Sequence, residues 1–328
     1  MSTIERRYVH IDEESRSLSV KTDEASTPAA GEVLIAVDAA GINRADLLQR
    51  KGLYPPPPDA SPIMGLEVSG TVAAVGDGVE GWAVGDAICA LTHGGGYASH
   101  AIAPVGQCLP VPASYSLREA AGLPEAVLTV WHNIFQRAGF ESGDTVLIHG
   151  GASGVGSLGV AMCKAMGGRV FSTAGSDEKC RRVEALGAER AINYREEDYA
   201  EVLAELGLTD GVDIILDMVG GDYIQKNLAV AAPEGRIVNI AYQHGFAAEV
   251  NFLPVLLKRL TVTGSTLRAQ SLAQKTQMVH EIRDRLFEHL DSGAVKPIID
   301  REFPLEDALA AQDYMESGVH MGKILLIP

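Results

Sequence analysis

The sequence predicts an α/β protein in which a doubly wound parallel sheet of six strands is joined to a second, β-rich domain. Strand and helix patterns alternate regularly over residues 145–266, whereas the first third is rich in glycine and proline and holds short β-like runs. A chain of 328 residues is also long enough for about two domains. We expect a β-rich domain over 1–125, the parallel sheet over 126–267, and a return to the first domain over 268–328.

Composition narrows the class of protein. Lys and Arg number 27 and Asp and Glu 43, so the formal net charge is −16, which argues against nucleic acid or an anionic membrane as a partner. Cys89, Cys108, Cys163 and Cys180 are too far apart for a structural zinc site or a disulfide framework. The first residues lack the apolar stretch of a secretory signal, and no apolar run approaches the ~18 residues of a membrane span. We expect a reduced, cytoplasmic protein without a metal.

The first third contains three strand-like runs, at 31–38, 70–75 and 86–91, separated by glycine turns. Tyr54 precedes four consecutive prolines, 55–58, which cannot be helical and should form a stiff extended loop. Short strand-like runs separated by such turns are typical of a small β barrel or sandwich.

The middle of the chain alternates short apolar strands with helices. Strands are expected at 145–149, 170–174, 191–194, 212–217, 236–240 and 261–266. Helices are expected at 155–166 and 253–260, and three further helices should follow the second, third and fourth strands and end at residues 186, 206 and 230. Strands without polar alternation, each followed by a helix, indicate a parallel sheet covered on both faces. Right-handed crossovers then give the doubly wound (Rossmann) topology.

The last part of the chain predicts one long helix over 271–290 and a final strand over 322–327. Since the β-rich region can supply partners for that strand, we expect the carboxyl terminus to return to it. Strand 261–266 would leave an open sheet edge, and open edges favour pairing. The sequence therefore predicts a homodimer, which proline at Thr263 should disrupt.

A glycine-rich segment, 149–156, leaves a strand and opens a helix. Gly151, Gly154 and Gly156 let the backbone turn sharply and approach a diphosphate at the helix amino terminus. Val155 stands where a serine-hydrolase elbow requires glycine, and no Gly-Lys-Ser/Thr follows, so a P-loop is excluded as well. A tight glycine turn without a ligand remains the alternative.

The end of the second strand of the sheet bears on which dinucleotide would bind. An Asp or Glu there would favour NAD, but the strand ends at Thr173-Ala-Gly-Ser176. Ser176 resembles a helix N-cap, and Lys179 at the third helical position is unfavourable against the helix dipole. A bound 2′-phosphate would explain that lysine, although a solvated lysine is the alternative and Asp177 and Glu178 count against NADP.

Other polar residues have ordinary structural explanations. Asn43 and Asp46 have the spacing of a helix N-cap and its acidic third residue. His93 and His100 flank a glycine turn and have no further metal ligand at suitable spacing, so we interpret them as loop and strand residues. His149, in a buried strand, is expected to be a hydrogen-bonded core residue.

Taken together, several motifs resemble the medium-chain dehydrogenase/reductase superfamily, in its zinc-lacking quinone oxidoreductase branch. They are Gly-Ile-Asn-Arg-Ala-Asp at 41–46, Leu-Tyr-Pro at 53–55, Gly-Leu-Glu-Val-Ser-Gly at 65–70, Val-Gly-Asp at 84–86, the glycine-rich segment, and Met-Gly-Lys-Ile at 321–324. The resemblance extends nearly end to end, and within the branch it looks closest to the tumour-suppressor-induced quinone oxidoreductase group. It implies a GroES-like catalytic domain beside a Rossmann NADP-binding domain.

The same resemblance implies zinc-independent chemistry. Zinc alcohol dehydrogenases of the superfamily place a cysteine where this chain has Asn43 and a histidine where it has Leu66, and neither replacement is a good zinc ligand. The implied reaction is hydride transfer from NADPH to a quinone in a dry cleft between the domains. An alkenal or enone reductase, and an NADPH-binding protein with little turnover, remain alternatives.

Residue roles follow from the resemblance alone. Asn43 matches a residue near the nicotinamide, Asp46 shapes the adjoining wall, and Tyr54 could donate a hydrogen bond or proton to the developing oxyanion. The other implied cofactor-binding residues are Thr129, Gly151, Ser153, Gly154, Val155 and Gly156 at the diphosphate, Ser176, Lys179 and Tyr194 at the 2′-phosphate, and Tyr242, Leu267, Arg268 and Lys323 along the rest of the groove.

Overall fold

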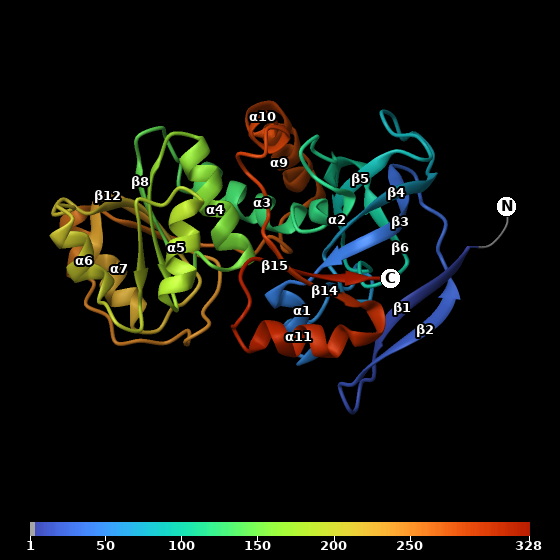
Figure 1. Ribbon diagram of the computed structural model, residues 1–328, viewed down its shortest axis with the longest axis horizontal. Helices are drawn as coiled ribbons and strands as arrows, with labels where there is room; N and C mark the ends of the chain where they lie inside the picture. Colours follow the sequence, from blue (N-terminus) through green and yellow to red (C-terminus); the bar gives the residue numbers. More distant parts are fainter. Residues whose placement is uncertain (1–3) are drawn as a thin grey trace. The chain divides into compact units, whose positions relative to one another are not determined.

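The computed structural model describes residues 4–328, which divide into two compact units (Figure 1). Unit 1 contains the described residues up to Ala126 together with Ser271–Pro328, and unit 2 is Val127–Gln270. The boundaries predicted from the sequence lie after residues 125 and 267. No helix within the described residues is both long and apolar enough to span a membrane.

Unit 2 is built on a parallel sheet whose described strands number six, in the order β10-β9-β8-β11-β12-β13. The strands are β8 (Thr145–Ile148), β9 (Arg169–Ala174), β10 (Arg190–Asn193), β11 (Val212–Asp217), β12 (Ala231–Asn239) and β13 (Thr261–Gly264). The helices that follow them are α4 (Gly154–Ala165), α5 (Asp177–Ala185), α6 (Tyr199–Glu205), α7 (Tyr223–Val230) and α8 (Leu253–Lys258). This confirms the predicted doubly wound sheet.

The strand order reverses direction at one place in the sheet. The chain runs outward from β8 to β10, then returns to place β11 on the other side of β8. Ligands of open α/β sheets bind outside the carboxyl ends of the strands at such a switch point. The glycine-rich segment leaves β8 at this position.

The entrance to unit 2 differs from the prediction. Helix α3 (Pro124–Val130) is followed by a π-helical stretch, Trp131–Arg137, in which the rings of Trp131 and Phe135 stack with centroids 4.7 Å apart. The sequence pattern predicts no helix or strand over these residues. Strand β12 also begins earlier than the predicted 236–240, since Ala231 already pairs with Val212 of β11.

Unit 1 contains a sheet of seven described strands, in the order β14-β15-β3-β4-β5-β7, with β6 also paired to β3. These strands are β3 (Glu32–Gly41), β4 (Glu67–Val75), β5 (Ala87–Leu91), β6 (His100–Pro104), β7 (Cys108–Pro110), β14 (Ile299–Pro304) and β15 (Lys323–Ile327). A hairpin of β1 (Glu5–Ile11) and β2 (Leu18–Glu24) accompanies them. Because Leu325 of β15 pairs with Gly41 of β3, the predicted return of the carboxyl terminus is confirmed.

The helices of unit 1 correct one prediction. They are α1 (Arg44–Arg50), α2 (Leu117–Ala120), α9 (Leu272–Arg285), α10 (Phe287–Asp291) and α11 (Ala308–Glu316), with short 3-10 turns at Val105–Gln107 and Leu305–Asp307. The single helix predicted over 271–290 is wrong, because the backbone leaves regular helical geometry at Leu286, at φ −116°. Helix α11 and strand β14 were not predicted.

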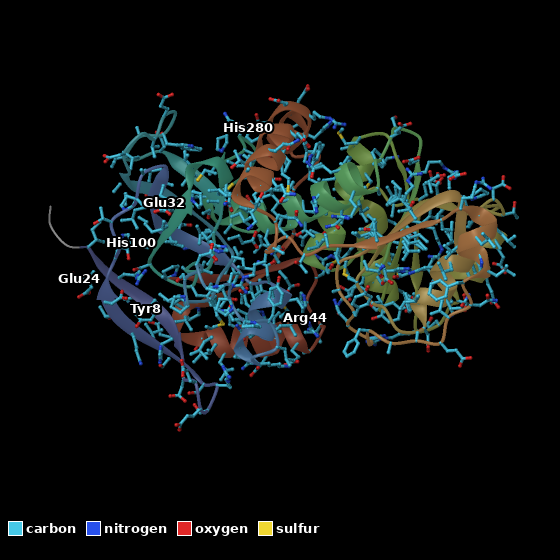
Figure 2. The ribbon with its side chains drawn as sticks, turned by 180° about the vertical axis from the view of Figure 1, so that it is seen from behind. Tyr8, Glu24, Glu32, Arg44, His100 and His280 are labelled. Atoms are coloured by element: carbon cyan, nitrogen blue, oxygen red, sulfur yellow. The ribbon has the colours of Figure 1, made fainter. Side chains whose placement is uncertain are left out.

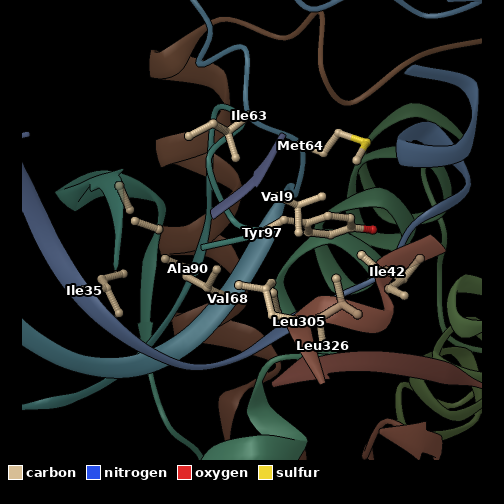
Figure 3. Close-up of a cluster of buried hydrophobic side chains, with 14 of the residues drawn as sticks. Val9, Ile35, Ile42, Ile63, Met64, Val68, Ala90, Tyr97, Leu305 and Leu326 are labelled. Carbon is tan, nitrogen blue, oxygen red and sulfur yellow. The ribbon is translucent and has the colours of Figure 1, made fainter. Parts of the chain in front are cut away.

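The core of unit 1 collects apolar side chains from both ends of the chain (Figure 3). Val9, Ile42, Met64 and Leu326 belong to this cluster together with Tyr97, which is fully buried. A buried phenol requires a hydrogen-bond partner. The partner of Tyr97 lies at the start of α1, so the core also fixes part of the candidate site.

The β1–β2 hairpin is attached to the segment that precedes β6. Val9 N donates to Tyr97 O at 2.9 Å, and Tyr8 forms an isolated antiparallel bridge with Ala98. Figure 2 labels Tyr8 on β1 and His100 at the start of β6 in this part of unit 1. The hairpin thereby covers the backbone that carries Tyr97.

Candidate active site

The first turn of α1 in unit 1 brings Asn43 and Asp46 together. Asn43 is the N-cap, with extended backbone at φ −126° and ψ 155°, and its N–H donates to Asp46 Oδ2 at 2.8 Å. The capping interpretation of this pair is therefore confirmed. Asp46 also accepts hydrogen bonds from the Tyr97 hydroxyl at 3.0 Å and the Gly65 N–H at 3.2 Å.

Asp46 is fully buried, and burial is the main cause that raises its pKa to about 6. The three hydrogen bonds and the positive charge of Lys323 oppose this rise. The three hydrogen-bond donors to its carboxylate are the N–H of the N-cap Asn43, the Gly65 N–H and the Tyr97 hydroxyl. Asp46 therefore holds the N-terminus of α1 against the core.

A buried ion pair lies beside Asn43. Lys323 Nζ, on β15, forms a salt bridge with Glu67 Oε1 at the start of β4, and both side chains are almost completely shielded from solvent. Lys323 Nζ also donates to Asn43 Oδ1 at 2.7 Å, and Asn43 Nδ2 donates to Glu67 Oε1 at 2.9 Å. We call Asn43, Glu67 and Lys323 the buried triad.

The triad fixes the orientation of the Asn43 amide. An ammonium group can only donate and a carboxylate can only accept, so the amide oxygen must face Lys323 and the amide nitrogen must face Glu67. Glu67 Oε2 is held in turn by the backbone N–H of Glu125 at 2.9 Å. Gly41 leaves the necessary space, because a Cβ there would lie 2.2 Å from Glu67 Oε1.

The triad does not provide a zinc site. No three His, Cys, Asp or Glu side chains within residues 4–328 are grouped so that they could hold a metal ion. Leu66 has no donor atom, and the carboxylate of Glu67 is engaged by Lys323, Asn43 and the Glu125 N–H. The residues present do not fit catalytic zinc.

Tyr54 follows α1 in a loop of unit 1. Its backbone N–H donates to Leu48 O at 3.2 Å, and the side chain is half-buried. The four prolines that follow form no helix, as predicted.

In unit 2, the glycine-rich segment forms the predicted strand–turn–helix. Ser153 is the N-cap of α4, and its Oγ accepts the Gly156 N–H at 2.9 Å. A Cβ on Gly156 would lie 2.2 Å from Gly150 O, and one on Gly151 would lie 2.1 Å from Ser172 Oγ. These glycines are required by close backbone and side-chain approach, while Gly154 and Val155 form the partly exposed start of the helix.

The end of β9 also agrees with the prediction. Ser176 is the N-cap of α5 and accepts the Lys179 N–H at 3.3 Å, so Lys179 is the third helical residue. Tyr194, just after β10, is 43% exposed and packs over Gly175, where a Cβ would lie 2.6 Å from its hydroxyl. Ser176, Lys179 and Tyr194 therefore belong to neighbouring strand ends of one sheet.

The remaining predicted cofactor residues have these positions. Thr129 is buried on α3, Tyr242 is 47% exposed and packs against Gly220, Leu267 and Arg268 follow β13, and Lys323 belongs to the buried triad of unit 1. Glu67 lies in the motif at 65–70, but no role is predicted for it from the sequence.

His149 is confirmed as a hydrogen-bonded core residue, since it is fully buried and contacts Thr173 and Asn227. The sequence pattern does not predict Asn227 and Asp217 as its hydrogen-bonding neighbours. One available signal was Asp217, the buried acidic residue that ends β11 after the apolar run 214–216.

Comparisons with known proteins bear on both units. The family model described as zinc-binding dehydrogenase matches residues 154–283, and the alcohol dehydrogenase GroES-like domain matches residues 29–113. The chain is 31% identical over 304 residues to quinone oxidoreductase 1 of Escherichia coli, covering 92% of each protein. It therefore belongs to the medium-chain dehydrogenase/reductase superfamily, with a Rossmann-type unit and a GroES-like unit.

Two solved structures are similar over almost the whole chain. Escherichia coli quinone oxidoreductase complexed with NADPH is 29% identical with a TM-score of 0.86, covering 98% of this chain and 100% of that one. The CurK enoyl reductase is 29% identical with a TM-score of 0.85, covering 98% and 99%. Another relative is much longer: the chain is 31% identical over 97% of its own length to a phenolphthiocerol/phthiocerol polyketide synthase of Mycobacterium tuberculosis, but spans only 14% of that protein.

Proposed function

We propose that this oxidoreductase transfers hydride from NADPH to quinones without zinc. The observation that carries the proposal is the amino terminus of α4, where Gly154 and Val155 form a partly exposed first turn at the switch point of the sheet. Such a terminus is suited to a diphosphate, because free N–H groups and the positive end of the helix dipole coincide there. The NADPH complex of the Escherichia coli relative supports the assignment.

The end of strand β9 supports a preference for NADPH over NADH. β9 stops at Ala174 without an acidic side chain, and Ser176 and Lys179 supply a hydroxyl and an ammonium group at the start of α5. An acidic residue there would bind ribose hydroxyls, whereas a cation can pair with a 2′-phosphate. We assign Ser176, Lys179 and Tyr194 to the 2′-phosphate end of the nucleotide.

The other proposed contacts of the nucleotide belong to unit 2. They are Thr129, Gly151, Ser153, Gly154, Val155 and Gly156 for the diphosphate region, and Tyr242, Leu267 and Arg268 for the remainder. For Lys323 we propose an indirect role, because its Nζ is engaged by Glu67 and Asn43.

When bound, NADPH supplies the hydride. In unit 1, the buried triad holds the amide of Asn43 in one orientation, with one of its two N–H bonds committed to Glu67. We propose that its other N–H orients the nicotinamide or the acceptor, that Tyr54 donates a hydrogen bond to the acceptor oxygen, and that Asp46 positions Asn43. A quinone suits this site because its reduction needs little Lewis-acid assistance.

An acceptor panel tests the proposed function. Purified protein, dialysed against a chelator, should oxidise NADPH with a simple benzoquinone or an ortho-quinone, and NADH should support slower turnover. Alkenals and enones form the second arm, which the similarity to CurK enoyl reductase favours as the alternative activity. Higher turnover with enones would replace the quinone by an enone as the substrate class. Absence of NADPH oxidation with either class would contradict both activities.

We further propose a homodimer in which β13 continues the sheet into a second copy. β13 is the edge strand of the unit 2 sheet, and the neighbouring α8 carries exposed Leu253, Leu256 and Leu257, at 53%, 74% and 66% exposure. An unpaired edge beside an apolar surface is typical of an interface between copies.

Val262→Pro tests this dimer better than proline at Thr263. Ser265 N donates to Asn239 O of β12. Since alternate N–H groups of a strand point to the same side, the N–H of Thr263 also faces β12, and proline at this position would remove a hydrogen bond within the sheet itself. By the same alternation, the N–H of Val262 faces the open edge of the sheet, and this residue is 47% exposed. Val262→Pro should yield monomers in sedimentation analysis, whereas Val262→Thr, which keeps the N–H, should remain dimeric. Equal sedimentation of both variants would contradict the edge-strand dimer.

A further inference from the structure

A chain of buried polar groups lies under the glycine-rich segment of unit 2. Gly150 N donates to Thr173 Oγ1 at 3.3 Å, and Thr173 Oγ1 lies 3.2 Å from His149 Nδ1. His149 Nε2 lies 2.8 Å from Asn227 Oδ1, and Asn227 Nδ2 donates to Asp217 Oδ2 at 3.1 Å. The four side chains are at most 1% exposed. We call this chain the relay.

The two ends of the relay fix the direction of its hydrogen bonds. At one end, the Gly150 N–H can only donate. At the other, Asp217 Oδ1 accepts the N–H groups of Val219 and Gly220 at 2.6 and 3.2 Å, so this carboxyl acts as an acceptor. The Asn227 amide must therefore present its nitrogen to Asp217 and its oxygen to His149.

This direction selects one form of His149. Since Asn227 Oδ1 can only accept, His149 Nε2 must carry a hydrogen, and in a neutral ring Nδ1 is then an acceptor. The Thr173 hydroxyl donates to Nδ1, which leaves its oxygen lone pairs for the Gly150 N–H. Each group of the relay is thus satisfied only when the imidazole is neutral and protonated at Nε2.

The surroundings of His149 favour the neutral ring. Burial is the main cause that lowers the pKa of His149, while Asp217 and Asn227 act in the opposite direction. The rings of Tyr199 and Tyr223 meet the imidazole edge-on, with centroids 4.9 and 4.7 Å away. Tyr199 also places its hydroxyl 2.9 Å from Asn227 Oδ1, which gives that oxygen a second donor.

Gly150 transmits the relay to the start of α4. Its backbone has φ +70°, which favours glycine, and its carbonyl accepts the Ser153 N–H at 2.9 Å. The same carbonyl leaves room only for glycine at position 156. Gly150 is therefore held by the relay through its N–H and contacts the first turn of α4 through its C=O.

The relay also includes Asp217, at the end of strand β11. Asp217 closes the turn after β11, and Gly220 in that turn packs against Tyr242. The turn and the glycine-rich segment follow β11 and β8, the two strands that flank the switch point of the sheet. One set of hydrogen bonds thus links both loops at this position.

From these contacts we infer that His149 and Thr173 are positioning residues: through the relay they hold Gly150 so that the amides at the start of α4 are preorganised for the nucleotide diphosphate. This inference rests on the proposed nucleotide binding. Its structural part concerns the chain alone and can be tested without a ligand.

Valine and serine at position 173 separate the hydroxyl from the shape of the side chain. In Thr173→Val, hydrogen exchange of the Gly150 amide in the nucleotide-free protein should accelerate, and NADPH should bind about 5- to 10-fold more weakly. In Thr173→Ser, which keeps the hydroxyl, both quantities should return to within about 2-fold of the wild type. Adenosine 2′-monophosphate lacks the diphosphate, so its affinity should be equal in all three proteins.

Tyr199→Phe is the matched control in the same buried cluster. It removes a hydrogen bond to Asn227 Oδ1 but leaves every link from Asp217 to Gly150, so NADPH affinity and Gly150 exchange should stay near wild-type values. A loss of NADPH affinity equal to that of Thr173→Val would show a general effect of destabilisation and overturn the relay.

Nitrogen NMR of the nucleotide-free protein with labelled histidine provides the direct signature. His149 should show the neutral Nε2–H form at neutral pH, whereas an Nδ1–H form or an imidazolium ion would overturn the inference. Failure of the wild type to bind NADPH would overturn the proposed function and leave the NMR and exchange results to decide the relay. NADPH binding of equal strength in the Val and Ser variants would overturn the positioning role alone.

Discussion

Lys323→Met should lower the free energy of unfolding by about 3–5 kcal/mol, because it leaves the buried carboxylate of Glu67 without its cation. Glu67 is 0% exposed and Lys323 2% exposed, so water cannot replace the lost partner. Asn43 Oδ1 would lose its donor in the same variant. Urea denaturation followed by circular dichroism measures the change.

Two further variants make this prediction specific. The double variant Glu67→Gln with Lys323→Met has no buried charge and should recover most of the lost stability. Lys51→Met removes an ion pair with Glu316 in which both side chains are 40% exposed, and it should cost less than about 1 kcal/mol. Equal losses in Lys323→Met and Lys51→Met would contradict the account of the buried triad.

Gly156→Ala should weaken NADPH binding by about 10- to 100-fold, the loss expected when one or two charge-assisted hydrogen bonds to phosphate are misplaced. The new methyl carbon would lie 2.2 Å from Gly150 O, a backbone atom that can move only if the glycine-rich segment moves. That movement turns the amides at the start of α4 away from their common direction. Titration with NADPH, followed by the fluorescence of the nicotinamide, measures the loss.

Gly159→Ala is the control for this variant. It introduces the same methyl group one turn later in α4, where the nearest atom is the flexible Cδ1 of Ile148 at 3.2 Å. Its NADPH affinity should stay within about 2-fold of the wild type. If both alanine variants bind NADPH alike, the glycine-rich segment is not the diphosphate site.

The sequence predicted those parts of the fold that depend on local pattern. β11 occupies the predicted residues 212–217, because five of its six side chains are buried and a helix follows after a short turn. Ser176 was identified as an N-cap by its position after a strand and before a helical pattern. The return of the terminal strand was predicted because a strand needs partners and the β-rich region could supply them.

Elements with weak local signals were not predicted. Helix α11 buries Ala308, Ala311 and Gln312, which have helical spacing but are too small or polar to form an apolar stripe. The break at Leu286 was also not visible, since neither proline nor glycine marks it. Both features depend on tertiary packing, which local pattern does not record.

The sequence predicted those parts of the site that depend on contacts between residues near each other in the chain. Asn43, Asp46 and the glycine-rich segment lie in short motifs whose hydrogen bonds connect residues a few positions apart. The triad connects Glu67 with Lys323, and the relay connects His149 with Asn227, so both depend on how distant strands pair. A pattern along the chain identifies the polar residue in each case but not its partner.

Parallel titration of the full chain with NADPH and NADH tests the central claim most directly. We predict saturable NADPH binding that is about 10-fold or more tighter than NADH binding, the difference supplied by the 2′-phosphate at Ser176 and Lys179. Absence of binding by either dinucleotide, or tighter binding of NADH, would contradict the account.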